Sequence, residues 1–396
     1  MLKIKLIPAE HGDCIWIRIA DDNIFNILID GGTRKTYLDY IKKEIAQMEN
    51  TKEKIDLIIC THMDNDHIGG LVQTVSNIQS QKIGSIWYNG FLQVVNSSYY
   101  TKPNDKYTEQ DYKILDEIIA KGTTYDGKQE IGIKEGLALG TLLTEKKILV
   151  NPVTFGKAIS TEFVKNPVKI TDKVKITVIG PSKEKIKNLE TEWCKKMNER
   201  GFRFRVSNKL KLMEAFEYQM EAIKLFYKEK GNNITGFEGL EKHIGNLDEA
   251  DLSVTNKSSI TFIIHYGKEK FLFLSDTITD NELLQNLEHI VGHEYRFKAI
   301  KLPHHGSRYN ITHDFIKRYK ADEYYCLTNS RNFGHPDLEV LSALICCDSE
   351  FKELFFNYPI EKAFFLNNEM WKEKYNYDIT IGTEDDMIER NFKWKE

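Results

Sequence analysis

The segment Ile55-Asp-Leu-Ile-Ile-Cys-Thr-His62-Met-Asp64-Asn-Asp66-His67-Ile-Gly-Gly70 joins a short apolar run to a cluster of histidines and aspartates. The run Leu57–Cys60 is branched and apolar, which predicts a strand buried on both faces. Polar residues then lead into a helix that is predicted to begin near His67. Because a strand end is stiff and a turn can aim alternate side chains inward, these residues can face one point. The segment therefore predicts four metal ligands, His62, Asp64, Asp66 and His67.

Other polar residues follow predicted strands in both halves of the chain. Asp13 lies in a tight turn, and Asp30 ends an apolar strand before two glycines. Asp276 ends the second strand of a predicted hairpin. Two later motifs are Pro303-His304-His305-Gly-Ser307 and Asn332-Phe-Gly-His335-Pro336. An ordinary turn is the alternative role for Asp30, and a helix cap is the alternative for His335.

The succession of these motifs resembles that of the metallo-β-lactamase superfamily, in the branch named for the ComEC hydrolase domain of the competence DNA-uptake channel. The signature of the superfamily is Thr-His-x-His-x-Asp-His-x-Gly-Gly, and Asp64 stands at its second histidine. Ser275 replaces a glycine and Phe333 replaces a tyrosine of the ComEC-type pattern. Classical members have a further histidine at an intermediate position. His243 lies in that interval, but its surroundings predict a helix surface.

The resemblance implies an α/β fold, a four-layer αββα sandwich in which each half of the chain supplies one sheet. It spans both halves of a single domain, residues 1–396, and does not cover residues 99–250, which are expected to be a family-specific elaboration. Within the elaboration, residues 183–230 are expected to form a helical insertion of two charged, amphipathic stretches. Their apolar stripes are expected to pack on their own domain or on a partner. The sharper alternative is a lid over the active site or a dimerisation arm.

The resemblance also implies two divalent metal ions, with zinc as the expected metal and manganese as a competitor because Asp64 makes the first position harder. Asp276 is the expected bridge. His62 and Asp64 are assigned to the first metal, and Asp66 and His67 to the second. One of the two adjacent histidines completes the second position, while the other binds substrate or protonates a leaving group. The further expectations are listed by role: catalytic residues Asp66, His304 and His335; metal ligands including His304 and His305; supporting residues Asp13, Asp30, Ser307 and Asn332.

Metal-activated hydrolysis is the implied reaction, and a phosphodiesterase or nuclease is the favoured enzyme. Hydrolysis of a small ester, lactone or amide is the alternative within enzymes. The alternative from another class is a metal-binding subunit of a larger system, with a partner protein on residues 183–230. A homo-oligomer through the same residues is the other expected assembly.

The composition agrees with a globular protein and restricts its partners. Of the 396 residues, 41% are apolar, which is enough for a sizeable core. The formal net charge of -4 gives no general attraction to polyanions, so nucleic-acid binding would need a local basic patch or the metals. No apolar run approaches the ~20 residues that span a bilayer. The six cysteines are scattered, as reduced thiols would be. We therefore expect a cytoplasmic protein without a membrane partner.

Overall fold

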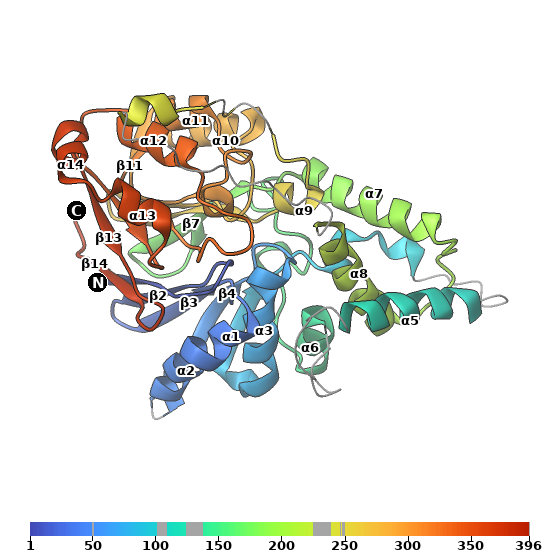
Figure 1. The fold of residues 1–396 in the computed structure, drawn as a ribbon. Helices are drawn as coiled ribbons and strands as arrows, with labels where there is room; N and C mark the ends of the chain where they lie inside the picture. The colour runs from blue at the N-terminus through green and yellow to red at the C-terminus, as the bar shows by residue number, and fades with distance from the viewer. Residues whose placement is uncertain are drawn as a thin grey trace.

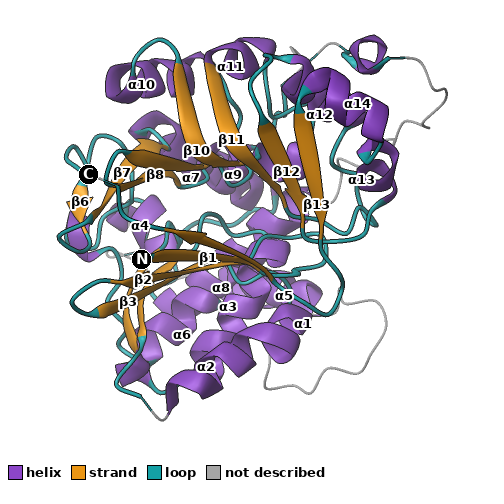
Figure 2. Ribbon diagram, turned by 90° about the vertical axis from the view of Figure 1, so that its left-hand side faces the viewer, coloured by secondary structure: helices purple, strands orange, loops and turns teal. Residues whose placement is uncertain are grey.

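Two β-sheets lie face to face in the computed structural model, and helices cover the outer face of each sheet (Figures 1 and 2). The structure describes residues 1–49, 51–100, 109–123, 138–224, 239–245, 247 and 250–395. The order of layers is helix, sheet, sheet, helix. The predicted four-layer αββα sandwich is therefore confirmed.

The first sheet has six strands, in the order β14-β1-β2-β3-β4-β5. Strands β3, β4 and β5 are parallel, whereas the other neighbours are antiparallel. Four helical segments follow its parallel strands along the chain: α1 (Arg34–Thr36), a π-helical turn (Tyr37–Ile41), α2 (Lys42–Glu49) and α3 (Asn65–Asn77). The strands are β1 (Leu2–Leu6), β2 (Ile15–Ala20), β3 (Ile24–Ile29), β4 (Ile55–Ile59), β5 (Ile83–Trp87) and β14 (Ile388–Phe392).

The second sheet has eight strands, in the order β13-β12-β11-β10-β9-β8-β7-β6. Strands β9 to β13 are parallel, so their carboxyl ends meet at one edge. The strands are β6 (Val168–Lys169), β7 (Val174–Gly180), β8 (Thr261–Tyr266), β9 (Glu269–Phe273), β10 (Tyr295–Lys301), β11 (Tyr319–Cys326), β12 (Lys352–Phe356) and β13 (Tyr377–Ile381). Its helices are α10 (Asn281–Val291), α11 (His313–Arg318), α12 (Leu338–Cys346), α13 (Glu361–Leu366) and α14 (Glu369–Tyr375).

The remaining helical elements connect strands within or between the two sheets. Short 3₁₀ turns are Ser80–Lys82, Ser97–Tyr99, Pro152–Thr154, Leu240–His243 and Pro303–Gly306. The helices are α4 (Phe91–Val94), α5 (Glu109–Thr123), α6 (Leu139–Glu145), α7 (Lys183–Glu199), α8 (Lys209–Lys224) and α9 (Val254–Lys257).

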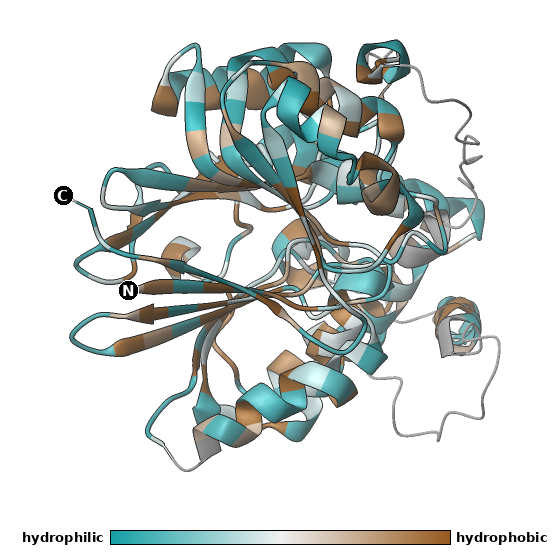
Figure 3. Ribbon diagram, turned by 60° about the vertical axis from the view of Figure 1, so that its left-hand side comes forward, coloured by the Kyte–Doolittle hydropathy of each residue, from teal (hydrophilic) through white to brown (hydrophobic). Residues whose placement is uncertain are grey.

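The core between the sheets is apolar on both facing surfaces, as Figure 3 shows along the central strands. Ile4 and Ile17 of the first sheet share this cluster with Phe262 and Phe355 of the second. Alternation of inward and outward side chains along each strand places them there. Two further clusters fill the spaces between each sheet and its helices. The sheets are thereby held at a fixed separation, and their strand ends meet along one edge.

The expectation that each half of the chain supplies one sheet is wrong in detail. The last strand, β14, pairs with β1, so the N-terminal sheet contains residues from the C-terminus. Strands β6 and β7 come from the expected elaboration and complete the second sheet beside β8. Val174, Ile176 and Val178 of β7 are buried between the sheets because they alternate along the strand. Part of residues 99–250 thus belongs to the sandwich itself.

The helical insertion packs on its own domain. Trp193 of α7 is fully buried, with its ring centroid 5.3 Å from Phe91 and 5.5 Å from Phe216 of α8. Burial of such a side chain stabilises the fold by roughly 1.5–3 kcal/mol. The predicted continuation of the second stretch to Lys230 lies outside the described residues. The apolar faces listed here are buried in one core cluster: Ile186, Leu189, Trp193 and Met197 of α7, and Leu212, Met213, Phe216 and Met220 of α8.

None of the helices in the described ranges combines the length and the apolar composition that crossing a membrane requires. All six cysteines are free thiols.

Candidate metal centre

The turn after β4 brings the first cluster of polar residues to the edge of the sheet. Asp64 is the N-cap residue of α3, and Asp66 and His67 lie in its first turn. Gly70 allows α3 to approach the turn after β3, because a Cβ there would lie 1.9 Å from the carbonyl oxygen of Gly31. This close approach brings His67 to the strand end that carries Asp30.

Asp276 lies at the centre of four imidazoles and is fully buried. Its Oδ2 lies 3.8 Å from Nε2 of His62 and 3.6 Å from Nε2 of His304. Its Oδ1 lies 3.5 Å from Nε2 of His67 and 3.9 Å from Nε2 of His305. The two oxygens of one carboxylate therefore face two different pairs of histidines.

The two nearby aspartates divide between the same pairs. Asp64 Oδ2 lies 3.0 Å from His62 Nε2, on the side of the Asp276 Oδ2 oxygen. Asp66 Oδ2 lies 4.0 Å from His67 Nε2 and 3.9 Å from His305 Nε2. We call the group around Asp276 Oδ2 the first position and the group around its Oδ1 the second position.

At the second position, a carboxylate holds the other nitrogen of each imidazole. Asp30 Oδ2 lies 2.9 Å from Nδ1 of His67, and Asp13 Oδ1 lies 3.2 Å from Nδ1 of His305. Asp13 also forms a close ion pair with the ammonium of Lys301. The hydrogen bond to Asp30 favours a proton on Nδ1 of His67 and leaves the lone pair of its Nε2 for a metal. The contact between Asp13 and Nδ1 of His305 has an ion-pair distance without the geometry of a hydrogen bond, and its negative charge favours a proton on the same nitrogen.

At the first position, neutral groups do the same. His62 Nδ1 lies 3.1 Å from the Thr61 hydroxyl, which itself donates a hydrogen bond to Asp30. His304 Nδ1 lies 2.9 Å from the amide oxygen of Asn310. All four imidazoles are thus oriented with Nε2 toward Asp276.

The structure differs from the expectation that only one of His304 and His305 can face the metal centre. Both residues have left-handed backbone conformations, with φ of 43° and 56°, and Gly306 follows with φ of 87°. A helical turn separates consecutive side chains by roughly 100°, instead of the 180° of a strand. Both imidazoles therefore point to the same carboxylate. Such backbone conformations cost about 1–3 kcal/mol each, and they occur mostly at functional sites.

The charged groups of the centre shift the pKa values of Asp276 and His67 in opposite directions. Burial alone would raise the pKa of the Asp276 carboxyl, but the facing imidazoles of His304, His67 and His305 hold it well below its ordinary value. Burial alone would lower the pKa of His67, whereas Asp276 and Asp30 raise it well above its ordinary value. Each group is thus stabilised in its charged form by its neighbours.

The residues present fit divalent metal ions. Nε2 of His67 and Nε2 of His305 are buried, and neither has a hydrogen-bond partner in the described part of the chain. Buried nitrogens without partners are costly unless they bind a ligand. The donor set of imidazoles and carboxylates suits zinc and manganese. His62, His67 and Asp276 form one such group, and Asp66, His67 and His305 form another, with ligand atoms within 4.8 Å of one another.

The other predicted site residues have different surroundings. His335 is buried beside the first position, with its ring centroid 5.1 Å from that of His304 and its Nδ1 3.4 Å from Asp337. Ser307 is buried and ends the turn that carries the two histidines. Asn332 is exposed and makes no hydrogen bond to a candidate ligand among the described residues. His243 packs on Phe365, away from the centre, as its predicted helix surface implies.

Four residues that contact the centre were not predicted as site residues. Thr61 and Asn310 hold imidazoles, as described above. Ser275 donates a hydrogen bond to Thr61 from a left-handed conformation, with φ of 49°, where the family pattern has glycine. Lys301 is 2% exposed and ends β10. The replacement of a pattern glycine by Ser275 was the one signal that the sequence offered for any of them.

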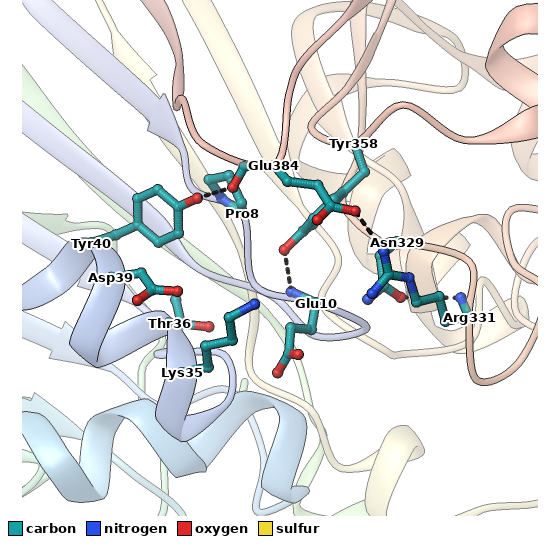
Figure 4. Close-up of a pocket in the computed structure, with 10 residues that line it drawn as sticks. All are labelled: Pro8, Glu10, Lys35, Thr36, Asp39, Tyr40, Asn329, Arg331, Tyr358 and Glu384. Carbon is teal, nitrogen blue, oxygen red and sulfur yellow. Dashed lines mark hydrogen bonds and ion pairs between the residues drawn. The ribbon is translucent and has the colours of Figure 1, made fainter.

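A pocket lies on the other side of the turn that carries Asp13 (Figure 4). Glu10, at the start of this turn, is fixed by hydrogen bonds from its amide to the Tyr358 hydroxyl and from Asn329 to its carbonyl. Arg331 and Glu384 line the pocket and pair with each other at 2.6 Å. The pocket contains none of the candidate metal ligands.

Comparisons with known proteins agree with the predicted superfamily. Residues 7–79 match the family model of the metallo-beta-lactamase superfamily. These residues include Asp13, Asp30 and the segment from His62 to His67. Hydroxyacylglutathione hydrolase 2 of Vibrio vulnificus (strain YJ016) is 36% identical over 75 residues, which make up 19% of this chain and 27% of that protein. The chain thus spans about a quarter of the length of that relative.

Two solved structures align along most of this chain at low identity. The metallo-beta-lactamase fold protein YhfI from Bacillus subtilis is 10% identical, with a TM-score of 0.35, and the alignment covers 98% of this chain and 99% of YhfI. The long form of RNase Z from yeast is 11% identical, with a TM-score of 0.31, and the alignment covers 90% of this chain and 36% of RNase Z.

Proposed function

We propose that the protein is a hydrolase that depends on two divalent metal ions. The observation that carries this proposal is the position of Asp276, whose two oxygens face two separate pairs of imidazoles. His62, Asp64 and His304 would hold one metal with Asp276 Oδ2. Asp66, His67 and His305 would hold the other with Asp276 Oδ1. In this assignment, His304 supplies the imidazole that the sequence lacked at the intermediate position.

Two bound divalent metals supply an acidified water and electrostatic stabilisation of the reacting ester. The chain's own residues orient the substrate and protonate its leaving group. His335 stands beside the first position, where Asp337 near its Nδ1 favours a proton transfer at the other ring nitrogen. We assign it the role of general acid for the leaving group. Its ring lies 6.3 Å from that of Phe333, at an interplanar angle of 22°, so Phe333 covers one side of the buried imidazole.

Phosphate diesters are the proposed substrates. Asp64 replaces an imidazole with a harder, anionic ligand, which favours oxygen-rich chemistry and makes manganese a competitor of zinc. The residues that resemble the ComEC-type pattern support the same class. The helical insertion also lies near the site, because α7 packs on α9 and Asn256 of α9 lies 3.5 Å from His304. Its cationic residues, among them Arg203 and Arg205 after α7, are a candidate path for a polyanion.

A second candidate is hydrolysis of a thioester or another small ester. The identity with hydroxyacylglutathione hydrolase 2 over residues that include the first cluster favours this alternative. A metal-binding subunit without its own activity is the proposal from another class, and the buried apolar faces of α7 and α8 leave their charged faces for a partner.

The test combines metal analysis with a substrate panel. The purified chain is loaded with zinc or manganese, and its metal content is measured by mass spectrometry. Bis-p-nitrophenyl phosphate, single-stranded DNA, a glutathione thioester and a lactone are then compared. We expect two metals per chain and turnover of the diesters. Turnover of the thioester alone would favour the second candidate, and two metals without turnover of any substrate would favour the subunit.

A further inference from the structure

A lysine lies inside the centre, where a cation should oppose metal binding. The ammonium of Lys301 is 3.9 Å from Asp276 Oδ1 and 3.1 Å from the carbonyl oxygen of Ser275. Its side chain is 2% exposed. Burial of a charge requires compensation, and here Asp13 supplies it through a close ion pair.

Lys301 connects residues from the two sheets. It ends β10 of the second sheet, whereas Asp13 lies in the turn before β2 of the first. The same carboxylate of Asp13 faces Lys301 with one oxygen and Nδ1 of His305 with the other. The chain of contacts thus runs from Lys301 through Asp13 to the imidazole whose Nε2 faces the second position.

Glycine makes this arrangement possible. A Cβ at Gly12 would lie 1.6 Å from the carbonyl oxygen of Asp66, so the turn with Asp13 passes directly over the start of α3. Asp13 is therefore packed between the residues of the second position and Lys301, and it is 2% exposed. A side chain held so closely has a definite orientation, which it passes to His305.

We propose that Lys301 is a positioning residue that retains the metal at the second position, by fixing Asp13 and through it His305. This inference rests on the proposed dinuclear site. It goes beyond that function because it gives a buried cation a role in retaining a metal ion, although the positive charge by itself would repel the metal. Groups that orient a ligand typically change metal affinity by about 10- to 100-fold.

The test is metal binding by the full chain, without reference to turnover. Zinc dissociation constants are measured by competition with a chromophoric chelator for the wild type and for Lys301→Met. We expect the wild type to bind two ions. In Lys301→Met, we expect one ion to bind about 10- to 100-fold more weakly and the other to be unchanged. If Lys301 acted by charge alone, its removal would tighten zinc binding, and this result would overturn the proposal.

A second variant distinguishes the positioning role of Lys301 from an effect of the substitution on folding. Asp13→Asn keeps the shape of the side chain, and the double variant Lys301→Met/Asp13→Asn leaves no unpaired charge. If Lys301 acts through Asp13, the double variant should weaken the same ion by no more than the stronger single variant. Additive losses would overturn the proposed pathway.

A matched control is available at the opposite end of the same sheet. Lys352 is also buried, begins β12 and pairs with Asp348 at 2.9 Å. Lys352→Met should leave both dissociation constants unchanged, and a loss equal to that of Lys301→Met would overturn the inference. A wild type that takes up no zinc or manganese would instead reject the proposed function, and this inference with it.

Discussion

The two proposed metal positions share one carboxylate and differ in the groups that hold their histidines. At the second position, the carboxylates of Asp30 and Asp13 are the nearest groups to Nδ1 of the imidazoles. At the first position, the nearest groups are the neutral Thr61 hydroxyl and Asn310 amide, and the Asp251 carboxylate lies farther away, 3.9 Å from Nδ1 of His304. A carboxylate on Nδ1 makes Nε2 a stronger ligand, because it stabilises the positive charge that the imidazole gains on coordination. We therefore expect the second position to hold its metal more tightly.

The surroundings of the two positions differ in the same direction. Lys301 and the turn with Asp13 enclose the second position. His335 and α9 lie beside the first, and α7 lies next to α9 (Figure 1). The difference suggests a division of work in which the second position anchors a metal and the first meets the substrate. Five sets of substitutions test this division of work.

Asp276→Ala should impair both positions, because both lose their shared ligand. We expect the loss of both metals and of most of the at least ~10⁶-fold acceleration that is typical of enzymes. Metal content and diester hydrolysis are the measurements. Asp280→Ala, which removes the N-cap of α10 and touches neither position, is the control. A variant that retained two metals and full turnover would refute the shared bridge.

His304→Ala and His305→Ala should each remove one metal, but not the same one. His305→Ala should leave a weakly held metal at the first position, whereas His304→Ala should leave a tightly held metal at the second. The rate at which a chelator removes the remaining ion distinguishes the two variants. Equal rates would contradict the proposed difference between the positions. Full metal content in either variant would show that the substituted histidine is not a metal ligand, and its role would then be catalytic alone.

His335→Ala should keep both metals and lower kcat by about 10²–10⁴-fold, which is the usual contribution of a general acid. The loss should be larger for a diester with a poor leaving group than for a nitrophenyl diester, because only the former needs a proton. His313→Ala on α11 is the control. Equal losses for both substrates would argue for a role of His335 in binding alone.

Asp30→Asn and Asn310→Ala test the supporting groups directly. Asn310→Ala should weaken the metal at the first position by about 10- to 100-fold. Asp30→Asn should weaken the metal at the second position by a similar factor, and that at the first position less, because Asp30 also accepts the hydrogen bond of the Thr61 hydroxyl that holds His62. Asn is compatible with the left-handed backbone of Asp30, whose φ is 52°. Calorimetric titration with zinc resolves the two affinities. If both variants weakened the same ion most strongly, the assignment of Asp30 and Asn310 to different positions would be wrong.

Charge reversal at Arg203 and Arg205 should have the smallest effect and only on polymers. We expect KM for single-stranded DNA to rise about tenfold at low salt and much less at high salt, because contacts with phosphates release counterions. Hydrolysis of a small diester should not change. Reversal of Lys372 and Lys374 on α14, across the molecule in Figure 1, is the matched control. A parallel fall with both substrates would point to an interface.

The sequence predicted the parts of this centre that are local. His62 to His67 lie on one strand end and one helix start, so spacing alone brings them together. Asp276 was identified because a family pattern places an aspartate there. The orientation of both His304 and His305 was not predictable, since it depends on a left-handed backbone at two residues that are not glycine.

The contacts that hold the imidazoles in place could not be predicted from the sequence either, for a different reason. Lys301 meets Asp13 across the two sheets, and Asn310 meets His304 through a turn whose conformation no pattern encodes. In the fold, the layers were implied by the resemblance to a known superfamily, but the pairing of β14 with β1 joins residues near positions 2–6 to residues near 388–392. Such contacts depend on the assembled tertiary structure and leave no local pattern.

The pairing of β1 with β14 has a consequence for synthesis of the protein. Leu2 to Leu6 are synthesised long before their partners Ile388 to Phe392. Until then β1 is the open edge of an apolar sheet, which is a template for pairing with another chain. Closing so long a loop is slow, because its entropy is lost before its contacts form. The nascent chain therefore needs this edge to be protected, for example by a chaperone, until β14 has been synthesised.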